Sequence, residues 1–98
     1  MLMIKMLLFV KKDIEENVLD HFRNFTLELL KDLGGEKFIT GTVMSSLLLE
    51  NKYNFYCELT ANSKEEMDRL LSGETGKKLN KDLADFHNEI DIIFINLE

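Results

Sequence analysis

The chain has 98 residues, a length that predicts a single domain spanning residues 1–98. Apolar residues make up 45% and charged residues 31%, the balance of an ordinary globular domain and not of a disordered tail. Twelve basic and eighteen acidic residues give a net charge of −6, which argues against electrostatic binding to nucleic acid or to an anionic membrane. One cysteine leaves no internal disulfide framework and no thiolate metal cluster.

The first ten residues are mostly apolar, but they lack the features of a secretory signal. Lys5 interrupts the run, Lys11 and Lys12 follow it, and no small-residue cleavage site is present. The run is also about half the length that a bilayer span requires. We therefore expect a β-strand in a cytoplasmic protein with no membrane partner.

The first strand and helix are predicted from hydrophobic periodicity. Residues 2–11 carry apolar side chains on both alternating faces, which is typical of a strand covered on both sides. Asp13 and Glu16 have the spacing of a capping box and predict a helix start, while Gly34 and Gly35 predict its end. The apolar stripe of this helix comprises Ile14, Val18, Phe22, Phe25, Leu29 and Leu33, widened by Leu19, Thr26 and Leu30.

The second half of the chain continues with strands and shorter helices. Residues 37–49 and 53–60 predict two strands joined by a polar turn at 50–52, with a bulge at Gly41. Ser63 and Glu66 form a second capping box that opens a short helix. Apolar spacing then predicts a further helical turn or two, and residues 90–97 predict a last strand. In the second strand of the pair, Tyr53, Phe55, Cys57 and Leu59 alternate with Asn54, Tyr56 and Glu58.

The resulting order β-α-β-β-α-β predicts an α+β, ferredoxin-like fold, in which helices cover one face of a four-stranded antiparallel sheet. The first and last strands are apolar on both faces, so the helices leave apolar surface uncovered. At ~25 cal/mol per Å², a few hundred Å² of such surface represents several kcal/mol. We therefore expect a homodimer packed sheet to sheet as a dimeric α/β barrel. The alternative is a monomer with a different strand register.

Residues 58–88 carry a resemblance to a known family. A helix opens at Ser63, a glycine-containing turn follows at residues 72–76, and Asp82 precedes Phe86 by four positions before the last strand. This pattern resembles the EthD family of dimeric α/β-barrel proteins, and the topology and length match over the whole chain. Family members often carry a histidine on the inward face of the first helix, where this chain has Thr26, and a proline in the turn, which is absent here.

The resemblance implies a pocket between helices and sheet that takes small, fairly apolar molecules, and related barrels perform lactone isomerisation, cyclisation or cofactor-free oxidation. We therefore expect an enzyme of isomerase, cyclase or oxygenase type that acts on a small apolar or aromatic compound without metal or cofactor. The absent inward histidine favours the alternative, a non-catalytic ligand-binding or accessory protein on the same dimeric scaffold. A regulatory ligand-binding domain with this topology is a third hypothesis.

The candidate catalytic residues are His21, at the edge of the helical stripe, and Asp82, at the family's acidic position. A half-exposed surface histidine and a carboxylate that bonds backbone N–H groups are the competing interpretations. Tyr56 is either a hydroxyl satisfied in the dimer core or a phenolic acid in a pocket. No metal-ligand spacing occurs, because the two histidines and the cysteine are scattered. The predicted pocket residues are Phe22, Thr26, Phe55, Tyr56 and Phe86.

Overall fold

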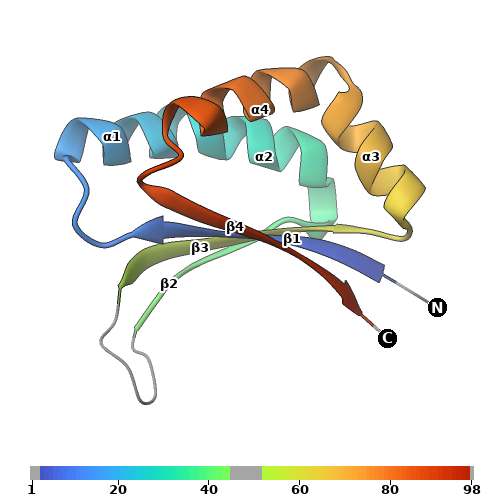
Figure 1. Ribbon diagram of the computed structural model, residues 1–98, viewed down its shortest axis with the longest axis horizontal. Helices are drawn as coiled ribbons and strands as arrows, with labels where there is room; N and C mark the ends of the chain where they lie inside the picture. The colour runs from blue at the N-terminus through green and yellow to red at the C-terminus, as the bar shows by residue number, and fades with distance from the viewer. Residues whose placement is uncertain (1–2, 45–51, 98) are drawn as a thin grey trace.

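The computed structural model describes residues 3–44 and 52–97 as a two-layer α+β structure (Figure 1). Its sheet has four antiparallel strands in the order β2-β3-β1-β4, and the helices cover one face of it, so the predicted ferredoxin-like arrangement is confirmed. The elements are β1 (Met3–Lys11), α1 (Glu16–His21), η1 (Phe22–Thr26), α2 (Leu27–Gly34), η2 (Gly35–Lys37), β2 (Ile39–Thr42), β3 (Tyr53–Ala61), α3 (Lys64–Ser72), α4 (Glu74–Asp85) and β4 (Ile90–Leu97).

The central strand β1 separates the two faces of the sheet. Met6, Leu8 and Val10 are buried beneath the helices, where they form the core together with Leu30 and Leu59. The alternate residues of β1 point to the opposite face, which no helix covers. We call this second surface the open face; its apolar members include Leu7, Phe9, Ile39, Ile93 and Ile95.

The first helix begins later than the capping-box spacing of Asp13 and Glu16 predicts. It starts at Glu16, and the N-cap is Glu15, whose backbone is extended at φ −65° and ψ 148°. The prediction is wrong because the chain leaving β1 is still tied to its neighbours: the Lys11 and Lys12 N–H groups each donate to a loop carbonyl at 2.9 Å. The predicted end is confirmed, since the helix stops at Gly34 and Gly35 adopts a φ of 55°.

Segments α1, η1 and α2 form one continuous helix whose middle turn is π-helical. The N–H of Leu27 donates to the carbonyl of Phe22, five residues earlier. This wider turn rotates the residues that follow it relative to a uniform α-helix. Phe22, Thr26 and Leu30 are buried as predicted, but Phe25, predicted on the apolar stripe, is 45% exposed.

The predicted strand pair at residues 37–49 and 53–60 is observed as β2 and β3. The first strand is shorter than predicted, since residues 37–38 and 43–44 are not part of it, and residues 45–51 lie outside the described residues. The bulge predicted at Gly41 is wrong, since Gly41 pairs with Tyr56 in an uninterrupted ladder. The irregularity falls instead between Val10 and Lys11, where Lys11 pairs with Tyr53. Tyr53 therefore shares the open face with Tyr56 and not the helix-covered face with Phe55.

Two helices follow β3. The predicted cap is confirmed, because the Ser63 hydroxyl accepts the N–H of Glu66 at 3.1 Å. Helix α4 is twelve residues long, more than the predicted turn or two, and Gly73 is the junction between α3 and α4. Within residues 3–44 and 52–97, no helix has the length and hydrophobicity needed to cross a bilayer.

Candidate active site

Three polar side chains from α1, η1 and α4 come together above the sheet, where η1 and α4 are in contact. The His21 Nε2 atom lies 2.5 Å from Asp82 Oδ1, and the Thr26 hydroxyl donates to Asp82 Oδ2. The Asp82 side chain is 7% exposed, whereas that of His21 is 35% exposed. The two predicted catalytic residues are therefore in direct contact, one at the surface and one buried.

The π-helical turn explains why His21 and Thr26 reach the same carboxylate. In a uniform α-helix, residues five apart point about 140° away from each other. The i→i+5 turn holds more residues, so positions 21 and 26 lie closer to one face of the helix. Such turns inside α-helices are frequent at functional sites.

The bonding pattern also fixes where the protons lie. An ionised carboxylate only accepts hydrogen bonds, so both Thr26 and His21 Nε2 donate to Asp82. In the neutral imidazole, the lone pair is then on Nδ1, which has no hydrogen-bond partner within residues 3–44 and 52–97. The arrangement presents a free imidazole base whose other nitrogen is held by a buried carboxylate.

Aromatic rings surround this base. The Phe86 ring lies 4.7 Å from the imidazole and the Phe25 ring 5.1 Å from it, centroid to centroid. Beneath His21, between helices and sheet, is a cavity of about 10 Å³. A volume of this size holds about one water molecule, whereas pockets for organic ligands measure roughly 300–1,000 Å³. With the side chains in these positions, an organic ligand does not fit in this cavity beneath His21.

Three of the predicted pocket residues, Phe22, Thr26 and Phe86, line this small cavity. Phe55 packs behind it, with its ring 6.1 Å from that of Phe22. Tyr56 lies on the open face of the sheet and does not share the cavity. The second histidine, His87, is exposed, and its imidazole lies 3.0 Å from the carbonyl of Ala84.

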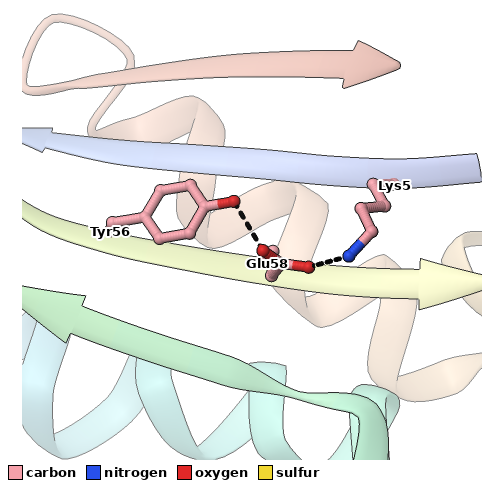
Figure 2. A network of polar contacts seen from close by, with 3 residues as sticks. All are labelled: Lys5, Tyr56 and Glu58. Atoms are coloured by element: carbon pink, nitrogen blue, oxygen red, sulfur yellow. Dashed lines mark hydrogen bonds and ion pairs between the residues drawn. The ribbon is translucent and has the colours of Figure 1, made fainter. Parts of the chain in front are cut away.

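A second polar cluster lies on the open face, across the sheet from His21. Figure 2 shows Tyr56, Glu58 and Lys5 in a row on β3 and β1, with the helices behind the sheet. The Tyr56 hydroxyl donates to Glu58 Oε1 at 2.7 Å, and the Lys5 ammonium donates to Glu58 Oε2. The hydrogen bond from Lys5 lowers the pKa of Glu58, while burial and the Glu58 carboxylate raise the pKa of Tyr56. Tyr56 is thus a protonated hydrogen-bond donor.

Two features of the His21 region were not predicted from the sequence. The hydrogen bond between Thr26 and Asp82 joins positions 56 apart in the chain. Lys78 and Lys81 line an outer groove next to Asp82, and their positions four and one residues before it on a helix were the available signal. Within the described part of the chain, no three His, Cys, Asp or Glu side chains converge as a metal site would require.

Cys57 is buried in the core. Burial raises the pKa of its thiol, whose sulfur lies 3.5 Å from the Thr40 hydroxyl. A protonated thiol in the core is a poor nucleophile.

No protein-family model matches the sequence, and no curated protein matches it. Among solved structures, an EthD family protein from Bacillus halodurans C-125 superposes with a TM-score of 0.79 and 19% identity, covering 95% of this chain and 96% of that one. A dimeric ferredoxin-like protein of unknown function from Jannaschia sp. CCS1 has a TM-score of 0.75 and 17% identity over 98% of both chains. A hydroxynitrile lyase from Passiflora edulis has a TM-score of 0.64 and 13% identity, covering 97% of this chain and 91% of that one.

Identities this low establish the fold and leave the chemistry to the residues of this chain. The match extends over nearly the full length of both chains in each comparison. It supports the resemblance carried by residues 58–88, and the chain is EthD-like in fold.

Proposed function

We propose that this protein is a homodimeric, cofactor-independent enzyme that uses His21 and Asp82 as an acid–base pair on a small apolar or aromatic compound. The observation that carries the proposal is the 2.5 Å contact between His21 Nε2 and the buried Asp82 carboxylate. A histidine held in this way has its second ring nitrogen available to accept a proton, as proton-transfer catalysis requires.

The proposed chemistry begins with proton abstraction by His21 Nδ1 from a C–H or O–H group of the substrate. Asp82 holds the Nε2 proton and stabilises the imidazolium that forms. Thr26 binds the second oxygen of Asp82 and so acts as a positioning residue. The imidazolium then returns the proton to another substrate atom or to a leaving group, which gives isomerisation or elimination with no change in oxidation state.

The His21–Asp82 pair also bears on the absence of a histidine at position 26. The EthD family often has an inward histidine at this position, and its absence favoured a non-catalytic protein. In this chain, His21 reaches the carboxylate that Thr26 also contacts, so an imidazole is available from an earlier position on the same helix. One structure of similar fold is a hydroxynitrile lyase, which is consistent with small-molecule chemistry on this scaffold.

The homodimer is proposed from the open face. Ile39 and Ile93 are 51% and 48% exposed there, beside Leu7 and Phe9. Apolar surface of this extent marks an interface, and several structures of similar fold are described as dimeric. A second copy packed sheet to sheet covers this surface.

A non-catalytic ligand-binding protein is the second candidate. It is favoured by the cavity of about 10 Å³ beneath His21, which has no room for a substrate without repacking. The two candidates differ in turnover and not in scaffold.

A turnover screen with matched histidine variants separates them. The substrates are cyanohydrins, unsaturated lactones and aromatic carbonyl compounds with acidic C–H groups. If His21 is the base, His21→Asn lowers kcat by about 10²–10⁴-fold. His87→Asn, which removes the exposed histidine outside the site, leaves kcat unchanged.

Equal activity of wild type and His21→Asn on a turned-over substrate contradicts the acid–base role. Thermal stabilisation by these compounds with no turnover in wild type supports the ligand-binding protein instead.

A further inference from the structure

A groove on the outer surface of the helical layer adjoins the His21–Asp82 pair. Its volume is about 250 Å³, and it is lined by Phe25, Lys78, Lys81, Asp82 and Asp85. Two of these residues connect it to the base: Asp82 bonds His21, and the Phe25 ring lies 5.1 Å from the imidazole. Asp82 therefore lines both the groove and the internal cavity.

The sizes of the two spaces indicate from which side a ligand approaches. The internal cavity of about 10 Å³ holds about one water molecule. The outer groove is close to the roughly 300 Å³ at which small-molecule sites begin. His21 is 35% exposed, so its ring is accessible from outside the helical layer.

Two ammonium groups of the groove are available to an anion. Lys78 and Lys81 are three residues apart on α4, and such residues share one helix face. Lys81 has no hydrogen bond or ion pair within the described ranges, and Lys78 makes only a 4.0 Å contact with the exposed Glu74. Asp82 already accepts two hydrogen bonds, which leaves Asp85 as the one unpaired carboxylate of the groove in the described part of the chain.

We propose that the groove binds an aromatic carboxylate, whose carboxylate lies between Lys78 and Lys81 and whose ring packs on Phe25. This proposal names the substrate class of the His21–Asp82 site. It rests on the proposed function, because the bound compound is a substrate only if His21 is the base. Phe25 is 45% exposed on an otherwise polar helix surface and offers a ring to stack against. Lys78 and Lys81 offset the charges of Asp82 and Asp85, so the groove is formally neutral in a chain that carries −6.

Binding of benzoate, followed by NMR chemical shifts of the full chain, tests the proposal without any need for turnover. Benzoate shifts the signals of Phe25, Lys81 and the His21 ring, and the neutral analogue benzyl alcohol binds about tenfold more weakly. The double variant Lys78→Ala/Lys81→Ala raises the dissociation constant of benzoate about three- to tenfold, the effect of two exposed ion pairs. Lys77→Ala, on the same helix but outside the groove, leaves it unchanged.

Asp85→Asn supplies a gain-of-affinity test. Removal of this carboxylate lowers the dissociation constant of benzoate about two- to threefold, because an exposed like charge is lost. Added salt weakens binding to wild type and has less effect on the double lysine variant.

The proposal is overturned if benzoate does not bind, if benzyl alcohol binds equally well, or if Asp85→Asn weakens binding. Shifts confined to Val10 and Ile14, which line the internal cavity, overturn it as well. If benzoate binds in the groove but His21→Asn has no effect on turnover, the groove proposal is supported and the acid–base role is overturned. No benzoate binding in the groove, together with a loss of turnover in His21→Asn, overturns the groove proposal and supports the acid–base role.

Discussion

Two carboxylates in this molecule are held in different ways. Asp82 is buried between helices and is satisfied by an imidazole and a hydroxyl. Glu58 lies on the open face and is satisfied by the Lys5 ammonium and the Tyr56 hydroxyl. The first arrangement presents a free base to the surface, whereas the second pairs a charge on the sheet face that also carries Leu7 and Phe9.

The ion pair of Glu58 makes stability depend on pH. Lys5 lowers the pKa of Glu58 below its ordinary value of 4.5, so the folded protein binds its proton less tightly than the unfolded chain does. The resulting stabilisation is complete above pH 4.5 and is lost as the pH falls through the folded pKa. We expect Glu58→Gln to lower the free energy of unfolding at pH 7, and the difference from wild type to shrink at about pH 3.

Urea unfolding at one fixed protein concentration measures this difference. Glu74→Gln is the matched control, because its contact with Lys78 at 4.0 Å is exposed and contributes little at either pH. A difference between wild type and Glu58→Gln that grows as the pH falls contradicts the role given to Lys5.

The sequence predicted His21 and Asp82 as separate candidates but not as a pair. They are 61 positions apart on different helices, and no local pattern encodes such a contact. Reading the first helix at a uniform 3.6 residues per turn left His21 at the edge of the stripe and placed Phe25 on it. His21 is half-exposed, as an edge position predicts, whereas Phe25 lies in the π-helical turn and is exposed. Nothing in the residue types at positions 22–26 predicts this turn.

At the level of elements, hydrophobic periodicity predicted the order of strands and helices correctly. The errors are at the ends, where tertiary bonds override local signals, as the late start of α1 at Glu16 shows. Ser63 capped its helix as predicted because the chain before it is extended and leaves the hydroxyl free to turn back. Capping residues therefore predicted the helix start correctly where no distant backbone group bonded the same segment of chain.

The junction of α3 and α4 depends on Gly76. A Cβ atom at this position would lie 2.3 Å from the Leu70 carbonyl oxygen and 2.5 Å from that of Leu71, both backbone atoms. We expect Gly76→Ser to lower the free energy of unfolding by about 1–3 kcal/mol, the usual cost of overpacking. Chemical denaturation measures the loss.

Gly73→Ser is the control for this element. A Cβ atom at Gly73 makes ordinary contacts of 3.7 and 3.8 Å, and the residue occupies the extended N-cap position of α4, which serine favours. This variant is expected to be neutral or slightly stabilising. Equal destabilisation by both substitutions would show that close packing at Gly76 is not the cause.

At the scale of the whole molecule, the two faces of the sheet are unequally covered. The helices bury the side chains of Met6, Leu8 and Val10, while the open face keeps its apolar residues exposed at the edges. The sequence alone predicted this uncovered apolar surface, because β1 and β4 carry apolar residues on both faces. Periodicity does not encode which molecule covers this surface, and the homodimer is proposed because a second copy has a matching apolar face.

Sedimentation equilibrium at micromolar concentration tests the sheet-to-sheet homodimer most directly. Wild type is expected at twice the 11.4 kDa mass of one chain. Ile93→Lys places a charge on the open face and is expected to give a monomer. Phe94→Lys, on the next residue of β4 and similarly exposed at 53% but on the other face, is expected to remain a dimer. A wild-type chain that sediments as a monomer of 11.4 kDa would contradict the proposed assembly.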